Sequence, residues 1–165
     1  MIEAISLWLH ETAAGKFFLT MFISMAPVAE LRVGVPAGVA MGLPIPLALL
    51  AGVMGNMVPV PFVILFIRNI FKWVRRNIPG LGACIDRIEA RAYRKIERHR
   101  RLRYEAWGLL LLVAIPLPGT GAWTGSLVAA LLNMRVKNAV PVILIGVVIA
   151  GLIVTALTYG VTAWL

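Results

Sequence analysis

Residues 26–36 read APVAELRVGVP, and residues 115–125 read IPLPGTGAWTG. Each stretch lies in the middle of apolar sequence long enough to reach deep into a bilayer, and each contains helix-breaking residues. Irregular backbone persists at membrane depth only where protein or water satisfies its polar groups. Paired breaks at corresponding positions of two halves are typical of the binding site of a membrane transporter.

The composition is that of an integral membrane protein. Hydrophobic residues make up 61% of the 165 residues and charged residues only 14%, whereas soluble domains carry about 25% charged residues. The mean hydropathy is +0.91. We predict a single all-α membrane domain over residues 1–165, placed in the cell (inner) membrane.

Positive charge is concentrated in residues 68–105, which hold 12 Lys or Arg and 4 Asp or Glu. Cytoplasmic segments of membrane proteins carry such an excess. Apolar residues at helical spacing within this segment predict a basic amphipathic helix on the cytoplasmic membrane surface. A solvated helix that binds a partner is the alternative. We expect no nucleic acid as a partner, because no basic motif interleaved with aromatic residues accompanies the charges.

The two halves, residues 1–67 and 106–165, repeat one plan of two short apolar arms around a break, followed by a long apolar segment. The arms are too short to span a bilayer, which predicts re-entrant hairpins. With the basic segment in the cytoplasm, the hairpins enter from opposite faces and the halves are inverted repeats. Four plain spanning helices are the alternative. The predicted hairpins are residues 17–43 and 106–134, and the predicted spans are residues 45–67 and 139–165.

Glu30 and Arg32 are the only ionisable residues inside the deep apolar stretches. A charge at the bilayer centre costs at least about 3 kcal/mol, so such residues face a cavity or a partner. The functional interpretation is that Glu30 carries a proton and Arg32 binds an anion, with Pro36 lining the same cavity. The alternative is a structural ion pair that closes the hairpin.

The second break offers backbone groups more than side-chain chemistry. Glycines let amides and carbonyls approach a ligand closely, and the helix N-terminus beyond a break attracts anions. A tight helix–helix contact is the alternative. The candidate substrate-binding residues here are Pro116, Pro118, Gly119, Thr120, Gly121, Trp123 and Thr124.

Asn56 is a polar residue inside the first span, where it makes either an interhelical hydrogen bond or a ligand contact. The single cysteine, Cys84, excludes an internal disulfide, and no metal-ligand cluster or Ser-His-Asp set is present. We therefore expect no metal, no cofactor and no enzymatic activity.

With both breaks and the two-half layout, the chain resembles the "putative small multi-drug export protein" family. The residues that carry the resemblance are Glu30-Leu31-Arg32 with Pro36, and the run from Pro116 to Trp123. That family resembles a compact relative of the DedA membrane proteins, which pair a Glu-containing re-entrant loop with a Pro/Gly-containing loop in an inverted repeat. DedA relatives are linked to moving lipids, including the undecaprenyl phosphate carrier. Their second loop typically carries arginines, where this chain has Gly119, Thr120 and Gly121.

These observations predict a transporter or flippase for an amphipathic, anionic lipid of the polyprenyl-phosphate or phospholipid kind, coupled to protons. Membrane lipids and protons are the expected partners, and a homodimer is expected because so small a bundle buries little surface. A drug or small-metabolite exporter is the second hypothesis, although Arg32 would repel a cationic drug. A non-transporting membrane scaffold built on the basic segment is the third.

Overall fold

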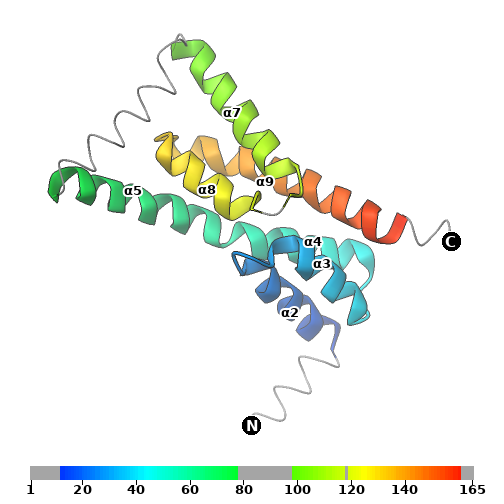
Figure 1. The fold of residues 1–165 in the computed structure, drawn as a ribbon. Coiled ribbons are helices and arrows are strands. Elements are labelled where there is room, and N and C mark those ends of the chain that lie inside the picture. The colour runs from blue at the N-terminus through cyan, green and yellow to red at the C-terminus, as the bar shows by residue number, and fades with distance from the viewer. Residues whose placement is uncertain (1–11, 78–97, 118, 161–165) are drawn as a thin grey trace.

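A computed structural model describes residues 12–77, 98–117 and 119–160, and Figure 1 shows their arrangement. Every regular element in these ranges is a helix, so the all-α prediction is confirmed for the described chain. Most of the predicted basic surface helix and Pro118 lie outside the described residues. The helices are α2 (Ala13–Met25), α3 (Glu30–Ala40), α4 (Ile45–Met57), α5 (Pro59–Asn77), α7 (Arg98–Ala114), α8 (Ala122–Leu131) and α9 (Val136–Thr155), continued by a π-helical turn, Ala156–Gly160.

Two helical stretches are long and apolar enough to cross a membrane: Ile45–Val74, formed by α4 and α5, and Val136–Gly160. α4 and α5 are separated only at Val58, because Pro59 and Pro61 lack the N–H groups that would bond to the preceding turn. The first stretch extends past the predicted end at residue 67, and the second begins at residue 136 rather than 139. The two stretches run in opposite directions (Figure 1).

Small residues bring the helices of the first half together. α2, α3 and α4 pack on one another, and a methyl group added at Gly55 of α4 would overlap the Met21 carbonyl of α2. At Gly34 of α3, an added methyl would overlap the Ser24 hydroxyl. In the second half, Gly125 and Gly146 approach Val113 of α7 in the same way. Close approach at small residues is the usual packing of helices in membranes.

α3 and α8 end in the same way. In each helix the residue after the C-cap has a positive φ, 90° at Gly42 and 52° at Asn133. The next residue then donates its N–H back to the helix, from Leu43 to Gly38 O (3.0 Å) and from Met134 to Ala129 O (2.9 Å). Together with the bonds from Gly42 and Asn133, these form Schellman motifs, which satisfy the last carbonyls of a helix.

A sequence offset of 91 residues aligns the ends of α3 and α8, because it pairs Gly42 with Asn133 and Leu43 with Met134. The same offset pairs the starts of α4 and α9 at residues 45 and 136. It also pairs Glu30 with Gly121, the positive-φ residues at the starts of α3 and α8. A sequence offset of 89, which matches Pro27 with Pro116, misses this correspondence by two residues.

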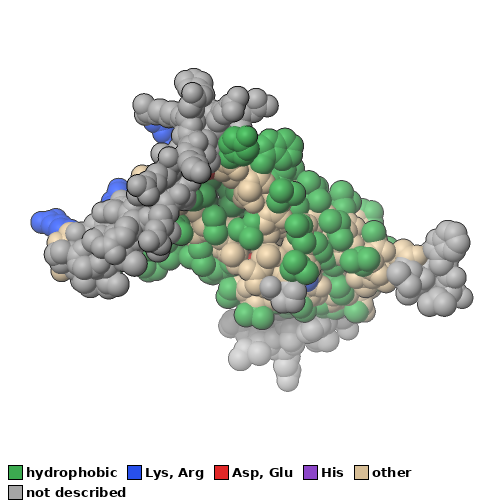
Figure 2. Space-filling model, turned by 45° about the horizontal axis from the view of Figure 1, so that its top comes forward, with side chains coloured by type: hydrophobic (Ala, Val, Ile, Leu, Met, Phe, Trp, Pro, Cys, Tyr) green, Lys and Arg blue, Asp and Glu red, His purple; other side chains and the backbone are tan. Residues whose placement is uncertain are grey.

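The outer surface is largely apolar. Phe62 and Phe66 of α5 are 69% and 66% exposed, and Figure 2 shows hydrophobic side chains over the middle of one face, with Lys and Arg side chains at its left end. Exposed apolar surface of this extent is typical of a surface that faces lipid or a partner. With its two long apolar helices, the chain has the character of a membrane protein.

Candidate functional site

The two breaks meet in the middle of the molecule, although 85 or more residues separate their contacts in sequence (Figure 1). We call this contact the junction, formed by residues 25–32 and 115–124 together with Asn56, which lies beside Glu30. The break between α2 and α3 covers only residues 26–29, and α8 already begins at Ala122. The first break was expected to extend to Pro36, which is too long: Glu30, Arg32 and Pro36 belong to α3. Trp123 and Thr124 belong to α8.

Arg32 joins α3 to the second break. Its guanidinium donates to the main-chain carbonyls of Leu117 and Thr120 and to the Thr120 hydroxyl at 3.0 Å. These acceptors are neutral, and the planar guanidinium suits several of them at once. In this conformation Arg32 therefore holds the loop that precedes α8.

Thr120 also shapes this loop from within. Its hydroxyl lies 2.6 Å from the Ile115 carbonyl and accepts from the Leu117 N–H at 3.1 Å. Thr124 closes the other side of the loop by donating to the Gly119 carbonyl at 2.8 Å. The side-chain hydroxyls thus replace backbone bonds that the interrupted helix cannot make, as irregular backbone in a membrane requires.

Glu30 reaches the N-terminus of α8. Its side chain is only 5% exposed, and its Oε1 accepts a hydrogen bond from the Trp123 N–H at 3.3 Å. A carboxylate in this position is stabilised by the unpaired amides and the dipole at the start of a helix. Glu30 has φ 47°, a conformation that is uncommon for a residue with a side chain and is often found at functional sites.

Gly121 leaves room for this carboxylate. It has φ 138°, and a methyl group at this position would overlap the Glu30 Oε2. Backbone of this kind is accessible almost only to glycine. Glu30 can therefore approach α8 this closely only because residue 121 is a glycine.

Trp123 adds a third connection across the junction. Its indole Nε1 donates to the Met25 carbonyl, the last residue of α2, at 3.1 Å. The backbone N–H of Trp123 is the donor to Glu30. One residue of α8 therefore contacts both the end of α2 and the start of α3.

Asn56 of α4 lies beside the Glu30 carboxylate. It is 1% exposed, and neither its Nδ2 nor its Oδ1 has a partner of hydrogen-bond geometry among the described residues. Leaving buried amide atoms without partners costs about 1–3 kcal/mol. Asn56 is therefore a candidate to bind a ligand, or to bind the Glu30 carboxylate after that side chain moves.

The predicted site residues are only partly brought together. Glu30, Arg32, Thr120, Gly121, Trp123 and Asn56 lie at the junction, and Gly119 and Thr124 belong to the same loop and helix start. Pro36 is six residues along α3 from Glu30, about 9 Å along the helix axis. Pro116 is half-buried beside the loop.

Glu30 and Arg32 form no ion pair in the described structure. Each charged side chain instead bonds to main-chain groups of the opposite break. In this conformation the contacts of both side chains therefore link the two breaks rather than closing a single hairpin. The carbonyls of Met25 and Leu117 were missed in the sequence, because a main-chain acceptor leaves no signal in residue type.

No cluster of three or more His, Cys, Asp or Glu side chains suited to a metal ion lies in the described part of the chain. What the junction offers chemically is one buried carboxylate, one guanidinium, one amide and a helix N-terminus. This set can move a proton and hold an anion.

A family described as "Putative small multi-drug export protein" matches residues 30–153. The chain belongs to this family. The match begins at Glu30, just after the first break, and includes the second break, the first long apolar stretch and most of the second. No curated protein and no solved structure matches the chain. The family name refers to export, so it favours transport over catalysis and leaves the substrate open.

Proposed function

We propose that this protein is a proton-coupled carrier that moves an amphipathic, anionic lipid across the membrane. The observation that carries the proposal is the buried Glu30 carboxylate bound to the N-terminus of α8 across the junction. This position suits an anion. Glu30 would therefore compete with the phosphate of a polyprenyl-phosphate or phospholipid-like substrate for the same amides.

Competition of this kind gives a route to coupling. A proton on Glu30 removes the charge that holds it to Trp123 N–H, and the start of α8 becomes available to a substrate phosphate. The phosphate would also draw Arg32 away from the Leu117 and Thr120 carbonyls, which frees the loop. Both contacts across the junction then weaken together, and the two halves can separate.

The carrier would be built as an inverted repeat of re-entrant hairpins. Support comes from the common offset of 91 between helix ends and from the opposite directions of α4–α5 and α9 (Figure 1). We place the basic end of α5 in the cytoplasm, because cytoplasmic segments carry the excess of Lys and Arg. A homodimer remains part of the proposal, since a bundle of this size buries little surface.

Drug export is the second candidate, and the family name favours it. A cationic drug could bind Glu30, but Arg32 lies two residues away on the same helix and would repel it. An anionic or zwitterionic compound would meet no such repulsion. The scaffold hypothesis depends chiefly on residues outside the described chain and receives no support from the junction.

The test is transport by purified protein in liposomes with and without a pH gradient. Fluorescent phospholipid, polyprenyl phosphate and a cationic dye are the substrates. The variants are Glu30→Gln and Arg32→Ala, with Glu105→Gln and Arg135→Gln as controls that make comparable charge changes away from the junction. We expect the lipids to move faster with the gradient, and each junction variant to lose at least about tenfold in rate, the effect of roughly 1.4 kcal/mol.

Unchanged lipid transport in Glu30→Gln and Arg32→Ala would overturn the proposal and leave the junction with a structural role alone. Transport of the dye alone would favour the drug exporter. Transport that needs both residues but ignores the pH gradient would retain the lipid carrier and remove proton coupling.

A further inference from the structure

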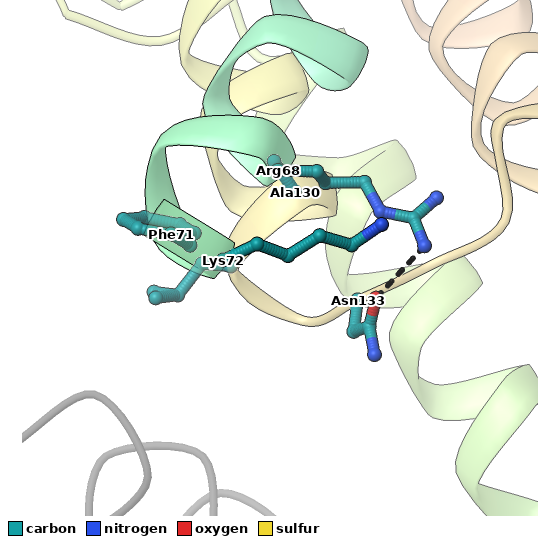
Figure 3. Close-up of a pocket in the computed structure, with 6 residues that line it drawn as sticks. Arg68, Phe71, Lys72, Ala130 and Asn133 are labelled. Carbon is teal, nitrogen blue, oxygen red and sulfur yellow. Dashed lines mark hydrogen bonds between the residues drawn. The ribbon is translucent and has the colours of Figure 1, made fainter. Parts of the chain in front are cut away.

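A second set of polar residues lies at the far end of α8, away from the junction. Arg68 and Lys72 are four residues apart on α5, so they lie on one face of that helix. In Figure 3 their side chains extend toward Asn133, in the turn between α8 and α9. Arg68 donates to the Asn133 Oδ1 at 3.0 Å. α8 has ten residues, so the turn is about 15 Å from the start of the helix.

These residues line a pocket of about 60 Å³, whose other walls are Phe71, Ala130 and Leu131. A water molecule needs roughly 10–15 Å³ of such space, so the pocket has room for a group of several heavy atoms. Among the described residues, its lining carries two cations and an amide and no acid. The Asn133 Oδ1 accepts from only part of the Arg68 guanidinium, which has five N–H donors.

The backbone at Asn133 fixes one wall of the pocket. Its φ of 52° belongs to the Schellman motif that ends α8, and Met134, the next residue, is only 5% exposed. The Ala129 and Ala130 carbonyls are already bonded within this motif. These bonded carbonyls therefore repel a bound anion less than unpaired carbonyls at a helix end would.

The position of the pocket along α5 indicates the class of ligand. Arg68 follows the apolar run of this helix, and Trp73, five residues further on, is 60% exposed. Exposed Trp and the first basic residues after an apolar run mark the headgroup level of a bilayer. Basic pockets between helices at this level bind the headgroups of anionic lipids.

We propose that Arg68, Lys72 and Asn133 bind the phosphate of an anionic lipid headgroup. Arg68 would hold two phosphate oxygens with its planar fork, and Lys72 would supply a second positive charge. Phe71 and Leu131 would contact the glycerol and the upper acyl chain. The bound lipid would link α5 of the first half to the α8–α9 turn of the second. This site is independent of the proposed transport, because it lies at the other end of α8.

The test measures lipid binding by the full-length protein, without any transport assay. Phosphatidylglycerol, phosphatidylcholine and inorganic phosphate are added separately to protein in neutral detergent, and affinity is read from native mass spectrometry and from the rise in unfolding temperature. The pocket variant is Arg68→Gln with Lys72→Gln. The matched control is Arg135→Gln with Lys137→Gln, which removes the same charge from two exposed residues near the same turn that do not line the pocket.

We expect the pocket variant to bind phosphatidylglycerol at least about tenfold more weakly than the native protein. The control variant should lose less than about threefold in affinity, because a charge near the surface contributes only modestly and is screened by salt. Phosphatidylcholine should bind weakly to all three proteins. Should the double variant fail to fold, Arg68→Lys tests the same site, because it keeps the charge and loses the fork; we expect intermediate affinity.

Equal losses in the pocket variant and the control would overturn the proposal in favour of diffuse attraction to the basic surface. Stabilisation by inorganic phosphate as strong as that by phosphatidylglycerol would also overturn it, because the site would then bind a free anion rather than a lipid.

Discussion

Gly121 is the residue on which the junction depends most directly. It combines a backbone conformation that other residues rarely adopt with the space taken by the Glu30 carboxylate. The neighbouring Gly119 also has a positive φ, 83°, but faces open space. Comparing substitutions at Gly121 and Gly119 therefore separates the effect of backbone strain from that of the contact with Glu30.

We expect Gly121→Ala to lower the free energy of unfolding by about 2–4 kcal/mol and Gly119→Ala by about 1 kcal/mol, since both suffer backbone strain but only the first displaces Glu30. Unfolding in mixed detergent micelles measures both values. Equal losses in the two variants would show that the Glu30 contact adds nothing to stability.

The site residues with unusual types were predictable from sequence, whereas their partners were not. Glu30 and Arg32 stand out because charges are rare in apolar segments, and Gly121 because it lies in a Gly-rich break. The sequence left two interpretations of these charges, a proton site with an anion site or an ion pair between them. In the structure each is satisfied by main-chain groups, and nothing in the residue types of Met25 or Leu117 indicates an acceptor.

At the scale of elements, the broken plan of each half was predictable, and the helix ends were less so. Pro36 suggested that the first break extends to that residue. α3 instead contains Pro36, whose missing N–H removes only the bond to the Arg32 carbonyl one turn earlier. The tight contacts at Gly34 and Gly55 hold α3 and α4 against α2, and this packing keeps α3 helical through the proline.

Gly55→Ala tests the packing of α4 on α2. The added methyl would overlap the Met21 carbonyl, which is backbone and cannot rotate away. We expect a loss of about 1–3 kcal/mol in the free energy of unfolding. Gly108→Ala is the control, because nothing lies within 4 Å of that position; it should be neutral or stabilise α7 by about 0.5–1 kcal/mol. A Gly55→Ala protein as stable as Gly108→Ala would mean that α2 and α4 are not tightly packed.

At the scale of the molecule, the offset of 91 pairs Pro44 before α4 with Arg135 before α9. Both residues are exposed N-caps at the corners where a return helix meets a long one. If the halves are inverted repeats, these corners lie on opposite sides of the membrane.

Labelling with a membrane-impermeant maleimide tests this arrangement. In a Cys84→Ala background, we expect Pro44→Cys to react from outside intact cells and Arg135→Cys to react only after the cells are opened, because the basic end should be cytoplasmic. Reaction of both from the same side would contradict the inverted repeat.

The partners of Glu30 and Arg32 also determine how the protein would respond to membrane voltage. Both formal charges at the junction belong to α3, and the groups they hold on the second half are neutral amides and carbonyls. Separation of the halves with Glu30 ionised would therefore move no net charge, and voltage would do no work on the empty carrier. With Glu30 protonated, the same movement carries the single positive charge of Arg32, for which a full crossing corresponds to about 2.3 kcal/mol per 100 mV. A proton would thus make an electrically silent motion sensitive to the membrane potential.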